Sequence, residues 1–292
     1  AYSLRNAKIN FDYLKNFAIR RFIRLSPPYY VSMVVALGFA FVASQAKGVD
    51  IEPLGQPLSF PRFFAHLFYL QDVFKLVHID DVYWTLCLEV QFYIVFFVLI
   101  GLVQWLNSSW NLSWSRAAVF VPVAVLSVLF PLGVFGVGSR PTIIFPLLYS
   151  FLLGVFAYWT WRENLKRLWF YMYCAVLLPA GIINFSGFAI TSVIVAILVL
   201  EVARANRMQG WLSWGWLQFL GKISYSLYLN HVSIIGATYF VGFKVLGRSA
   251  LSEFICLIAA VAASIIFGTL MWYLVEKPSI KWNKSIKMVN NA

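Results

Sequence analysis

Eight long apolar segments dominate the hydrophobic pattern of the chain. They cover residues 29–46, 84–105, 117–137, 142–161, 168–185, 187–203, 219–243 and 254–275. Each is near the ~20 residues that a helix needs to cross roughly 30 Å of hydrocarbon. A ninth stretch, Phe60 to Leu70, is too short, and Arg62 and His66 interrupt it, which favours an interfacial or re-entrant piece. The pattern predicts an all-α, polytopic transmembrane helical bundle of about eight spans.

The composition excludes the soluble classes. The 292 residues are 61% hydrophobic and 12% charged, whereas an ordinary soluble domain is about 25% charged and about 45–50% apolar. A soluble globule of this length has no interior large enough for so much apolar surface, and the same composition excludes a disordered chain. Cys87, Cys174 and Cys256 lie inside apolar runs and imply no disulfides.

The net charge of +12 is unevenly distributed along the chain. If the N-terminus is cytoplasmic, 17 of the 23 Lys and Arg residues fall on the cytoplasmic side of the predicted spans. This asymmetry is the positive-inside signal, and eight spans return the C-terminus to the cytoplasm. The excess charge therefore predicts that both termini are cytoplasmic, and it needs no nucleic-acid partner to explain it.

Two ionisable residues lie well inside the predicted spans, Glu89 and His231. Charged groups are costly in hydrocarbon, so such residues are functional candidates. Glu89 follows Trp84 in the run Trp-Thr-Leu-Cys-Leu-Glu, and Thr85, Glu89 and Tyr93 share one helix face at offsets of four residues. The alternative is a structural carboxyl that is hydrogen-bonded between helices.

His231 ends a second polar stripe. Ser224, Tyr228 and His231 fall at helical offsets of zero, four and seven residues, which places them on one face. The alternative is a packed histidine whose hydrogen bonds are satisfied. No second histidine or cysteine stands at metal-ligand spacing, so the sequence predicts no zinc site.

Three arginines, Arg20, Arg21 and Arg24, precede Pro27 and Pro28. In a helix, Arg21 and Arg24 share a face and repel each other. An anion between them would turn this repulsion into attraction, because guanidinium binds phosphate bidentately. The alternative is a positive-inside anchor that binds lipid head groups.

Two further polar motifs name no function by themselves. His78, Asp80 and Asp81 lie on the predicted outer side, where they frame an entrance or form a solvated loop. Glu276 and Lys277 precede Pro278 at the end of the last apolar segment. This motif indicates a helix stop with an ion pair.

Together these motifs resemble the acyltransferase-3 family of membrane acyltransferases. The matching segments are Arg20-Arg-Phe-Ile-Arg24 with the following Pro-Pro-Tyr-Tyr, Trp84-Thr-Leu-Cys-Leu-Glu89-Val-Gln-Phe-Tyr93, Phe219-Leu-Gly-Lys-Ile-Ser-Tyr-Ser-Leu-Tyr-Leu-Asn-His231, and Val275-Glu-Lys-Pro278. Their order and spacing extend over nearly the whole chain. The resemblance implies a ten-helix membrane enzyme that moves an acyl group, usually acetyl, from cytoplasmic acyl-CoA to a carbohydrate hydroxyl at or beyond the outer face.

The chain departs from the family pattern at its N-terminal side. The family has two helices before the Arg-x-x-Arg segment, and the first carries an arginine and a histidine regarded as catalytic. Here about twenty polar residues precede Arg20, and the chain starts with Ala1 rather than Met. We therefore expect a fragment that lacks these two helices, with the family's catalytic histidine upstream, and His231 does not take its place.

The resulting hypothesis is an acyl-CoA-dependent O-acyltransferase of a cell-surface carbohydrate, such as an O-antigen or exopolysaccharide. Acetyl-CoA is the expected donor, with no metal, and its phosphates are expected at Arg21 and Arg24. Glu89 and His231 are expected to support catalysis. The residues expected to position substrate are Trp84, Thr85, Tyr93, Ser224 and Tyr228.

The expected organisation is a basic cytoplasmic segment (1–28), a transmembrane acyltransferase domain (29–275) and a basic cytoplasmic tail (276–292). The expected location is the inner membrane of a bacterium, with membrane lipid as a further partner. The alternative function is a transporter or flippase for a lipid-linked sugar or small metabolite, for which broken helices or half-repeats are typical. A catalytically inactive bundle is the third alternative.

Overall fold

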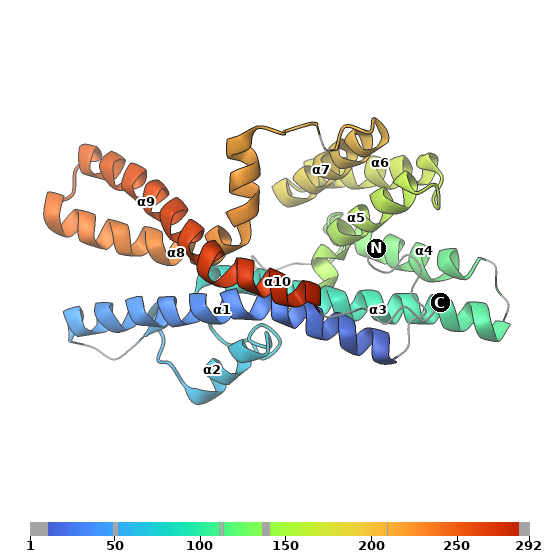
Figure 1. The fold of residues 1–292 in the computed structure, drawn as a ribbon. Helices are drawn as coiled ribbons and strands as arrows, with labels where there is room; N and C mark the ends of the chain where they lie inside the picture. The colour runs from blue at the N-terminus through green and yellow to red at the C-terminus, as the bar shows by residue number, and fades with distance from the viewer. Residues whose placement is uncertain are drawn as a thin grey trace. The chain divides into compact units, whose positions relative to one another are not determined.

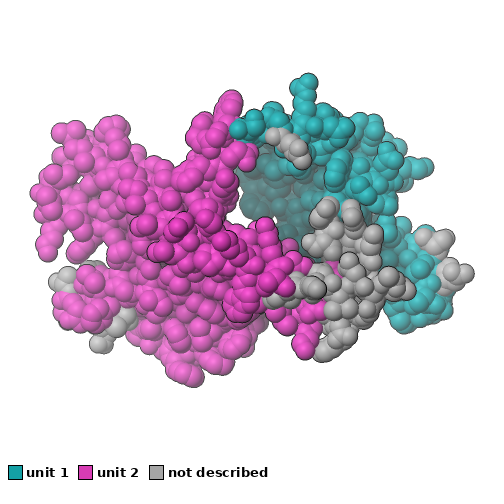
Figure 2. Space-filling model, in the orientation of Figure 1, with its two compact units in different colours: residues 1–9, 88–213 teal, residues 10–87, 214–292 magenta. Residues whose placement is uncertain are grey.

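The computed structural model describes residues 11–48, 52–110, 112, 114–135, 141–208 and 210–285, and all secondary structure in these ranges is helical (Figure 1). The α-helices are α1 (Phe11–Lys47), α2 (Phe60–Leu67), α3 (Trp84–Trp110), α4 (Ser115–Val128), α5 (Leu148–Trp161), α6 (Arg167–Ile183), α7 (Gly187–Arg204), α8 (Gly215–Leu246), α9 (Ala250–Met271) and α10 (Lys277–Ser285). Short turns are η2 (Pro53–Gly55), η3 (Asp81–Tyr83), η4 (Phe145–Leu147) and η5 (Trp272–Glu276). Two compact units divide the chain (Figure 2): among the described residues, unit 1 holds those of 88–213, and unit 2 holds those of 11–87 and 214–285.

Helix length and hydropathy agree with a membrane protein. Five helical stretches in the described residues are long and apolar enough to cross a bilayer: Tyr13–Gln45, Asp81–Trp110, Gly187–Arg204, Gly215–Leu246 and Ala250–Ser285. The other three predicted segments overlap shorter apolar helices, Ser115–Val128, Phe145–Trp161 and Arg167–Ile183. The all-helical prediction is confirmed for the described residues, while eight spans and cytoplasmic termini stay predictions.

Helix α1 begins earlier than the apolar pattern indicates. The helix continues through Pro27 and Pro28, although each proline inside a helix removes one hydrogen bond and crowds the preceding turn. Contacts with α8 hold this region: the Tyr225 hydroxyl donates to the Leu25 carbonyl at 2.9 Å. The three arginines before the prolines therefore lie on the same helix as the first apolar segment.

Unit 2 is organised by the antiparallel hairpin of α8 and α9 (Figure 1). The chain reverses at Gly247, whose φ of +71° suits a residue without Cβ. A Cβ on Gly268 would approach the Leu227 Cα to 3.1 Å, so glycine permits the close approach of the two helices. Ser32 joins α1 to α8, because its hydroxyl donates to the Leu229 carbonyl at 2.8 Å.

The prediction that the last helix stops at Pro278 is wrong. Helix α9 passes through the π-helical turn η5 and continues as α10 to Ser285. Proline is tolerated in the first turn of a helix, and a π turn changes the hydrogen-bond register just before it. The expected ion pair is also replaced: Glu276 accepts a hydrogen bond from Ser226, and the Lys277 ammonium lies 5.3 Å from the ring centre of Trp272.

Unit 1 contains α3 from Leu88 onward and helices α4 to α7, which pack around an apolar core. Fully buried aliphatic and aromatic side chains form its centre, including Leu152, Leu153, Phe170, Leu177 and Val193. The rings of Phe92 and Phe151 stack with their centres 4.2 Å apart, and such aromatic contacts contribute to core packing. Aromatic and branched side chains thus join α3 and α5 within this unit.

Helix α2 is short and amphipathic. Phe60, Phe64 and Phe68 extend from one face and are at least half exposed, with ring centres 5.9 and 5.0 Å apart along the row. The opposite face buries Arg62 and His66. An exposed apolar face on so short a helix favours the interfacial prediction.

Candidate functional site

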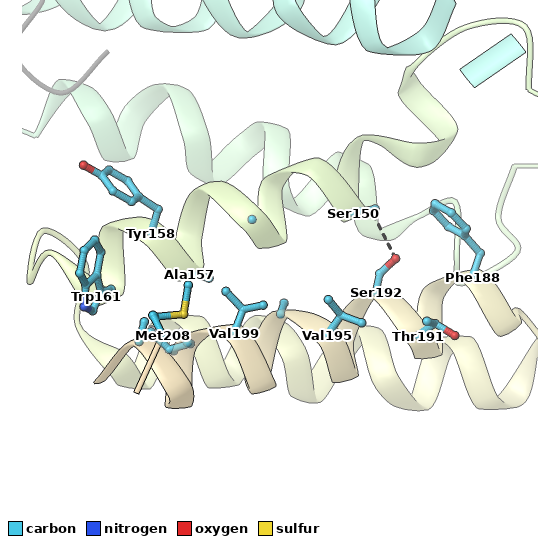
Figure 3. A pocket seen from close by; sticks show the side chains of 14 residues that line it. Ser150, Ala157, Tyr158, Trp161, Phe188, Thr191, Ser192, Val195, Val199 and Met208 are labelled. Carbon is cyan, nitrogen blue, oxygen red and sulfur yellow. Dashed lines mark hydrogen bonds between the residues drawn. The ribbon is translucent and has the colours of Figure 1, made fainter. Parts of the chain in front are cut away.

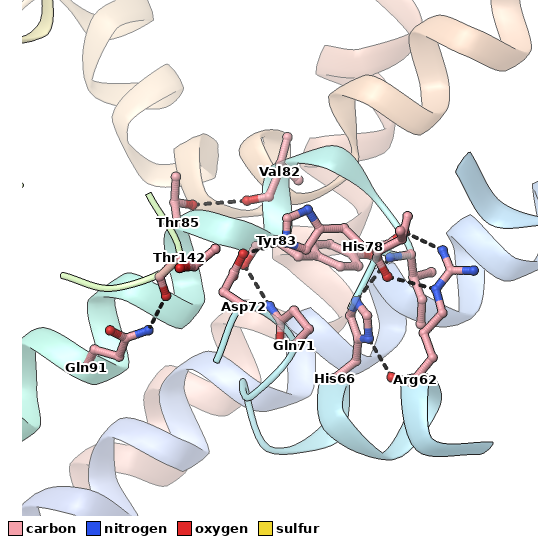
Figure 4. Close-up of polar contacts among 12 residues, drawn as sticks. Arg62, His66, Gln71, Asp72, His78, Val82, Tyr83, Thr85, Gln91 and Thr142 are labelled. Carbon is pink, nitrogen blue, oxygen red and sulfur yellow. Dashed lines mark hydrogen bonds and ion pairs between the residues drawn. The ribbon is translucent and has the colours of Figure 1, made fainter. Parts of the chain in front are cut away.

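The loop that precedes α3 is built around the guanidinium of Arg62, which is 3% exposed (Figure 4). This group donates to five backbone carbonyls at 2.5–3.1 Å, those of Pro53, Gln56, Pro57, Val77 and His78. These carbonyls lie on both sides of α2 in the sequence, so one side chain joins the two halves of the loop. Sequence reasoning treated Arg62 only as an interruption of an apolar run. The available sequence signal for this buried role was the position of Arg62 among apolar residues.

His66 completes this internal network. Its Nδ1–H donates to the Arg62 carbonyl at 2.7 Å, and its Nε2 accepts the backbone N–H of Ile79 at 3.0 Å. These partners require the neutral imidazole, since the Nε2 lone pair is already used. Burial lowers the pKa of His66 to about 4. His66 is therefore a structural residue of the loop.

The pKa of His66 predicts acid sensitivity. Above pH 6.5 the imidazole is neutral in both the folded and unfolded chain; between pH 6.5 and about 4 mainly the unfolded chain binds the proton. Stability is therefore lost as the pH falls through this window. From pH 7 to pH 5 this group should lower the free energy of unfolding by about 2 kcal/mol. Thermal unfolding of the wild type and His66→Gln at both pH values measures the difference. An equal loss of stability from pH 7 to pH 5 in the two proteins would refute the prediction.

Two further hydrogen bonds hold the segment between α2 and α3, one within the segment and one to η3, the turn just before α3 (Figure 4). His78 Nε2 donates to Asp72 Oδ1 at 2.8 Å, and Gln71 Nε2 donates to the Tyr83 carbonyl at 3.1 Å. Asp72 and Gln71 are both buried. The solvated-loop interpretation of this region is therefore wrong, because Asp80 is buried and His78 pairs with the buried Asp72.

Asp80 extends the buried polar network towards α8. It is 3% exposed and accepts hydrogen bonds from the Ser233 hydroxyl and from the Val82 N–H. Burial raises the pKa of Asp80, while these two hydrogen bonds and the nearby His231 act in the opposite direction. Sequence reasoning did not include Asp80 or Ser233 among the site residues. Spacing within one segment cannot reveal a partner 153 residues away.

The structure brings together two of the predicted site residues, Thr85 and Tyr228. Their hydroxyl oxygens are 2.7 Å apart, although 143 residues separate them in the sequence. Both hydroxyls also lie within 3.2 Å of the Val82 carbonyl oxygen. We call Asp80, Thr85, Tyr228, His231 and Ser233 the α3–α8 polar cluster.

The α3–α8 polar cluster holds His231 in one tautomer. His231 Nδ1 lies 2.8 Å from the Tyr228 carbonyl oxygen. A carbonyl can only accept, so the hydrogen is on Nδ1, and Nε2 of the neutral ring is an acceptor. The ring is half-buried at the middle of α8. Such an imidazole can accept a hydrogen bond from a substrate hydroxyl.

Glu89 and Tyr93 form a contact of their own. The Tyr93 hydroxyl donates to Glu89 Oε1 one helical turn away, as their spacing predicts. Both are half-buried and belong to unit 1, whereas His231 belongs to unit 2. A site shared by Glu89 and His231 stays a prediction.

The structure does not bring Ser224 into the cluster. Its side chain is exposed and donates to the Gly221 carbonyl of its own helix at 3.0 Å. The buried polar positions on this stretch of α8 are instead Ser226 and Asn230. Trp84 is half-buried at the first residue of α3.

The arginines of α1 lie beside α10 within unit 2. Arg20 Nε donates to Asn283 Oδ1 at 3.2 Å, and the Arg21 guanidinium lies 5.3 Å from the ring centre of Phe17. Arg24 is exposed and close enough to Glu276 for their charges to interact. We call this group the α1–α10 basic cluster; it comprises Arg20, Arg21, Arg24, Lys277, Lys281 and Lys284. Its donors are suited to an anion with several phosphates.

Within the part of the chain that the structure describes, no group of three or more His, Cys, Asp or Glu side chains could hold a metal ion. The site's chemical groups are therefore hydroxyls, carboxylates, arginines and the imidazole of His231.

Comparison with known proteins identifies the family to which this chain belongs. No curated protein and no solved structure matches the chain. The family model described as an acyltransferase domain matches residues 7–273, a range that includes both polar clusters except for the α10 lysines beyond residue 273. With its apolar helices, the chain therefore belongs to the acyltransferase-3 family of membrane acyltransferases.

Proposed function

We propose that this protein transfers an acyl group, acetyl in the first instance, from acyl-CoA to a hydroxyl of a cell-surface carbohydrate. The observation that carries the proposal is the tautomer of His231, which leaves Nε2 as an acceptor on the same helix as Tyr228, whose part-buried hydroxyl hydrogen-bonds with that of Thr85. A neutral nitrogen acceptor next to hydroxyl groups is suited to binding and orienting an alcohol.

The reaction replaces the thioester bond of acyl-CoA with an ester bond. The acceptor oxygen attacks the thioester carbonyl and loses its proton to a base; the carbon–sulfur bond then breaks and the CoA sulfur takes up a proton. In this proposal His231 has a supporting role: it accepts a hydrogen bond from the attacking hydroxyl and orients it towards the carbonyl. Glu89, held by Tyr93, is proposed to support the same step.

The α1–α10 basic cluster is the proposed site for the phosphates of CoA. CoA carries a 3′-phosphate and a pyrophosphate, so its charge is strongly negative at neutral pH. Arg21 and Arg24 lie three residues apart on α1, and their mutual repulsion falls when an anion lies between them. The predicted positive-inside orientation would place this cluster in the cytoplasm, where acyl-CoA is found.

Lysine substitutions distinguish this site from a plain membrane anchor. Arg21→Lys and Arg24→Lys keep the charge but remove the planar fork that holds phosphate bidentately. We expect each to weaken acetyl-CoA binding about tenfold or more, since one lost charge-assisted contact contributes about 1.5–3 kcal/mol. Equilibrium binding of labelled acetyl-CoA to the purified full-length protein measures this effect.

The matched control is Arg248→Lys, which changes an exposed arginine after α8 and should leave acetyl-CoA affinity unchanged. Wild-type affinity for acetyl-CoA in both α1 variants would contradict the phosphate-binding proposal and favour the membrane-anchor alternative for these arginines. Transfer of labelled acetyl from acetyl-CoA to membrane glycan tests the activity itself. Movement of a lipid-linked sugar across the bilayer without acetyl transfer would favour the transporter alternative.

A further inference from the structure

An apolar groove runs along α5 and α7 within unit 1, away from the α3–α8 polar cluster in sequence (Figure 3). Its volume is about 520 Å³. Gly154 and Trp161 line it from α5, and Val195 lines it from α7, with Met208 beyond the end of that helix. A groove of this size is in the range that binds small apolar ligands.

The groove offers almost nothing to a polar ligand. The hydroxyl oxygens of Ser150 and Ser192 lie 3.0 Å apart and hydrogen-bond to each other across the two helices (Figure 3). The space exists partly because Gly154 has no side chain: a Cβ built on it meets nothing within 4 Å. A flexible hydrocarbon chain matches this lining, and each buried CH₂ contributes about 0.8 kcal/mol.

Two exposed arginines follow or precede residues at one end of the groove, and the guanidinium of one of them, Arg162, lies 5.8 Å from the ring centre of Trp161. Trp161 and Met208 mark this end (Figure 3), and Arg162 and Arg207 are their immediate neighbours in the chain. Both arginines are exposed. Among the residues that the structure describes, Arg204 pairs with Glu201, whereas Arg162 and Arg207 form no ion pair. An apolar groove that ends at cations and a tryptophan is complementary to an anionic amphiphile.

We propose that this groove binds an anionic phospholipid of the surrounding membrane. The acyl chain lies between α5 and α7, and the phosphate of the head group lies at Arg162 and Arg207. Charge complementarity selects the anionic lipid, because a zwitterionic head group carries a compensating cation. This site is independent of the proposed acyl transfer, since it uses none of the residues assigned to that reaction.

Photo-cross-linking tests the proposal on the purified full-length protein in detergent. The probes are phosphatidylglycerol and phosphatidylcholine, each with a diazirine near the end of one acyl chain. We expect phosphatidylglycerol to label peptides of α5 and α7 at least fivefold more than phosphatidylcholine. Equal labelling by the two lipids would overturn the proposal.

Two sets of variants separate the acyl chain from the head group. Gly154→Leu fills the groove without a backbone clash and should reduce labelling at least tenfold. Gly101→Leu is its control, because Gly101 lies on α3 with equally open space around its Cβ and outside the groove. Arg162→Gln with Arg207→Gln should keep the labelling but abolish the preference for phosphatidylglycerol.

A second groove variant protects the test against misfolding. Val195→Trp starts from a half-exposed side chain in the groove and should also reduce labelling strongly. Thermal unfolding confirms that each variant is folded before labelling is compared. Unchanged labelling in folded Gly154→Leu and Val195→Trp would refute the groove as the lipid site.

Discussion

Replacing Arg62 by methionine is expected to lower the free energy of unfolding by more than about 3 kcal/mol. The substitution leaves five backbone carbonyls without their guanidinium donor, and each buried unsatisfied group costs about 1–3 kcal/mol. Relaxation and water entry recover part of this cost, which is why the expected loss is smaller than the sum. Methionine keeps the apolar part of the side chain but lacks the guanidinium, so most of the expected loss comes from the hydrogen bonds.

Thermal unfolding measured with a thiol-reactive dye checks this expectation, because Cys87, Cys174 and Cys256 are buried and free. The loss of stability in Arg62→Lys should be intermediate, because an ammonium has three N–H donors but lacks the planar geometry of the guanidinium. The control, Arg248→Met, removes an exposed arginine and should change stability by less than about 0.5 kcal/mol. If Arg62→Met unfolds at the temperature of this control, the loop does not depend on the guanidinium.

Replacing His231 by asparagine is expected to reduce the rate of acyl transfer by about 100-fold, the lower range for a group that assists proton transfer. The asparagine amide nitrogen takes the approximate place of Nδ1 and can donate to the Tyr228 carbonyl, so the local fold is kept. The acceptor at Nε2 is lost. Rates of acetyl transfer from labelled acetyl-CoA to glycan by the full-length protein measure the change.

The controls for His231→Asn are the affinity for acetyl-CoA and the unfolding temperature, which should both stay at their wild-type values. His231→Gln, whose terminal nitrogen lies nearer to Nε2, should be equally slow, because its NH₂ group donates a hydrogen bond where Nε2 accepts one. A variant with normal rate and lowered unfolding temperature would show that His231 only packs. A lowered affinity for acetyl-CoA would place it on the donor side instead.

The helical class and the family were predictable from the sequence, because both depend on local information. Apolar runs of membrane-spanning length predict helices wherever they occur, and every one of the eight predicted segments overlaps a helix of the structure. The offset of four residues between Glu89 and Tyr93 likewise predicts a contact within one helix, which the structure confirms. The family motifs are short, local and ordered, so they could be recognised without a fold.

Helix ends were less predictable, because prolines suggested boundaries that packing overrode. Helix α1 passes through Pro27 and Pro28, and the chain passes Pro278 after a π turn. In both places, contacts with α8 from Tyr225 and Ser226 hold the helix against the lost hydrogen bonds. A local rule about proline contains no information about such partners.

The sequence by itself thus determined a helical membrane protein of the acyltransferase-3 family, with polar residues at intervals that define helix faces. Only the tertiary structure decided which polar residues meet. It joins Thr85 to Tyr228 and Asp80 to Ser233, and it leaves Ser224 exposed. It also buries Arg62 among five carbonyls. The physical reason is that a buried polar group must find a partner, and those partners lie in segments far apart in the sequence.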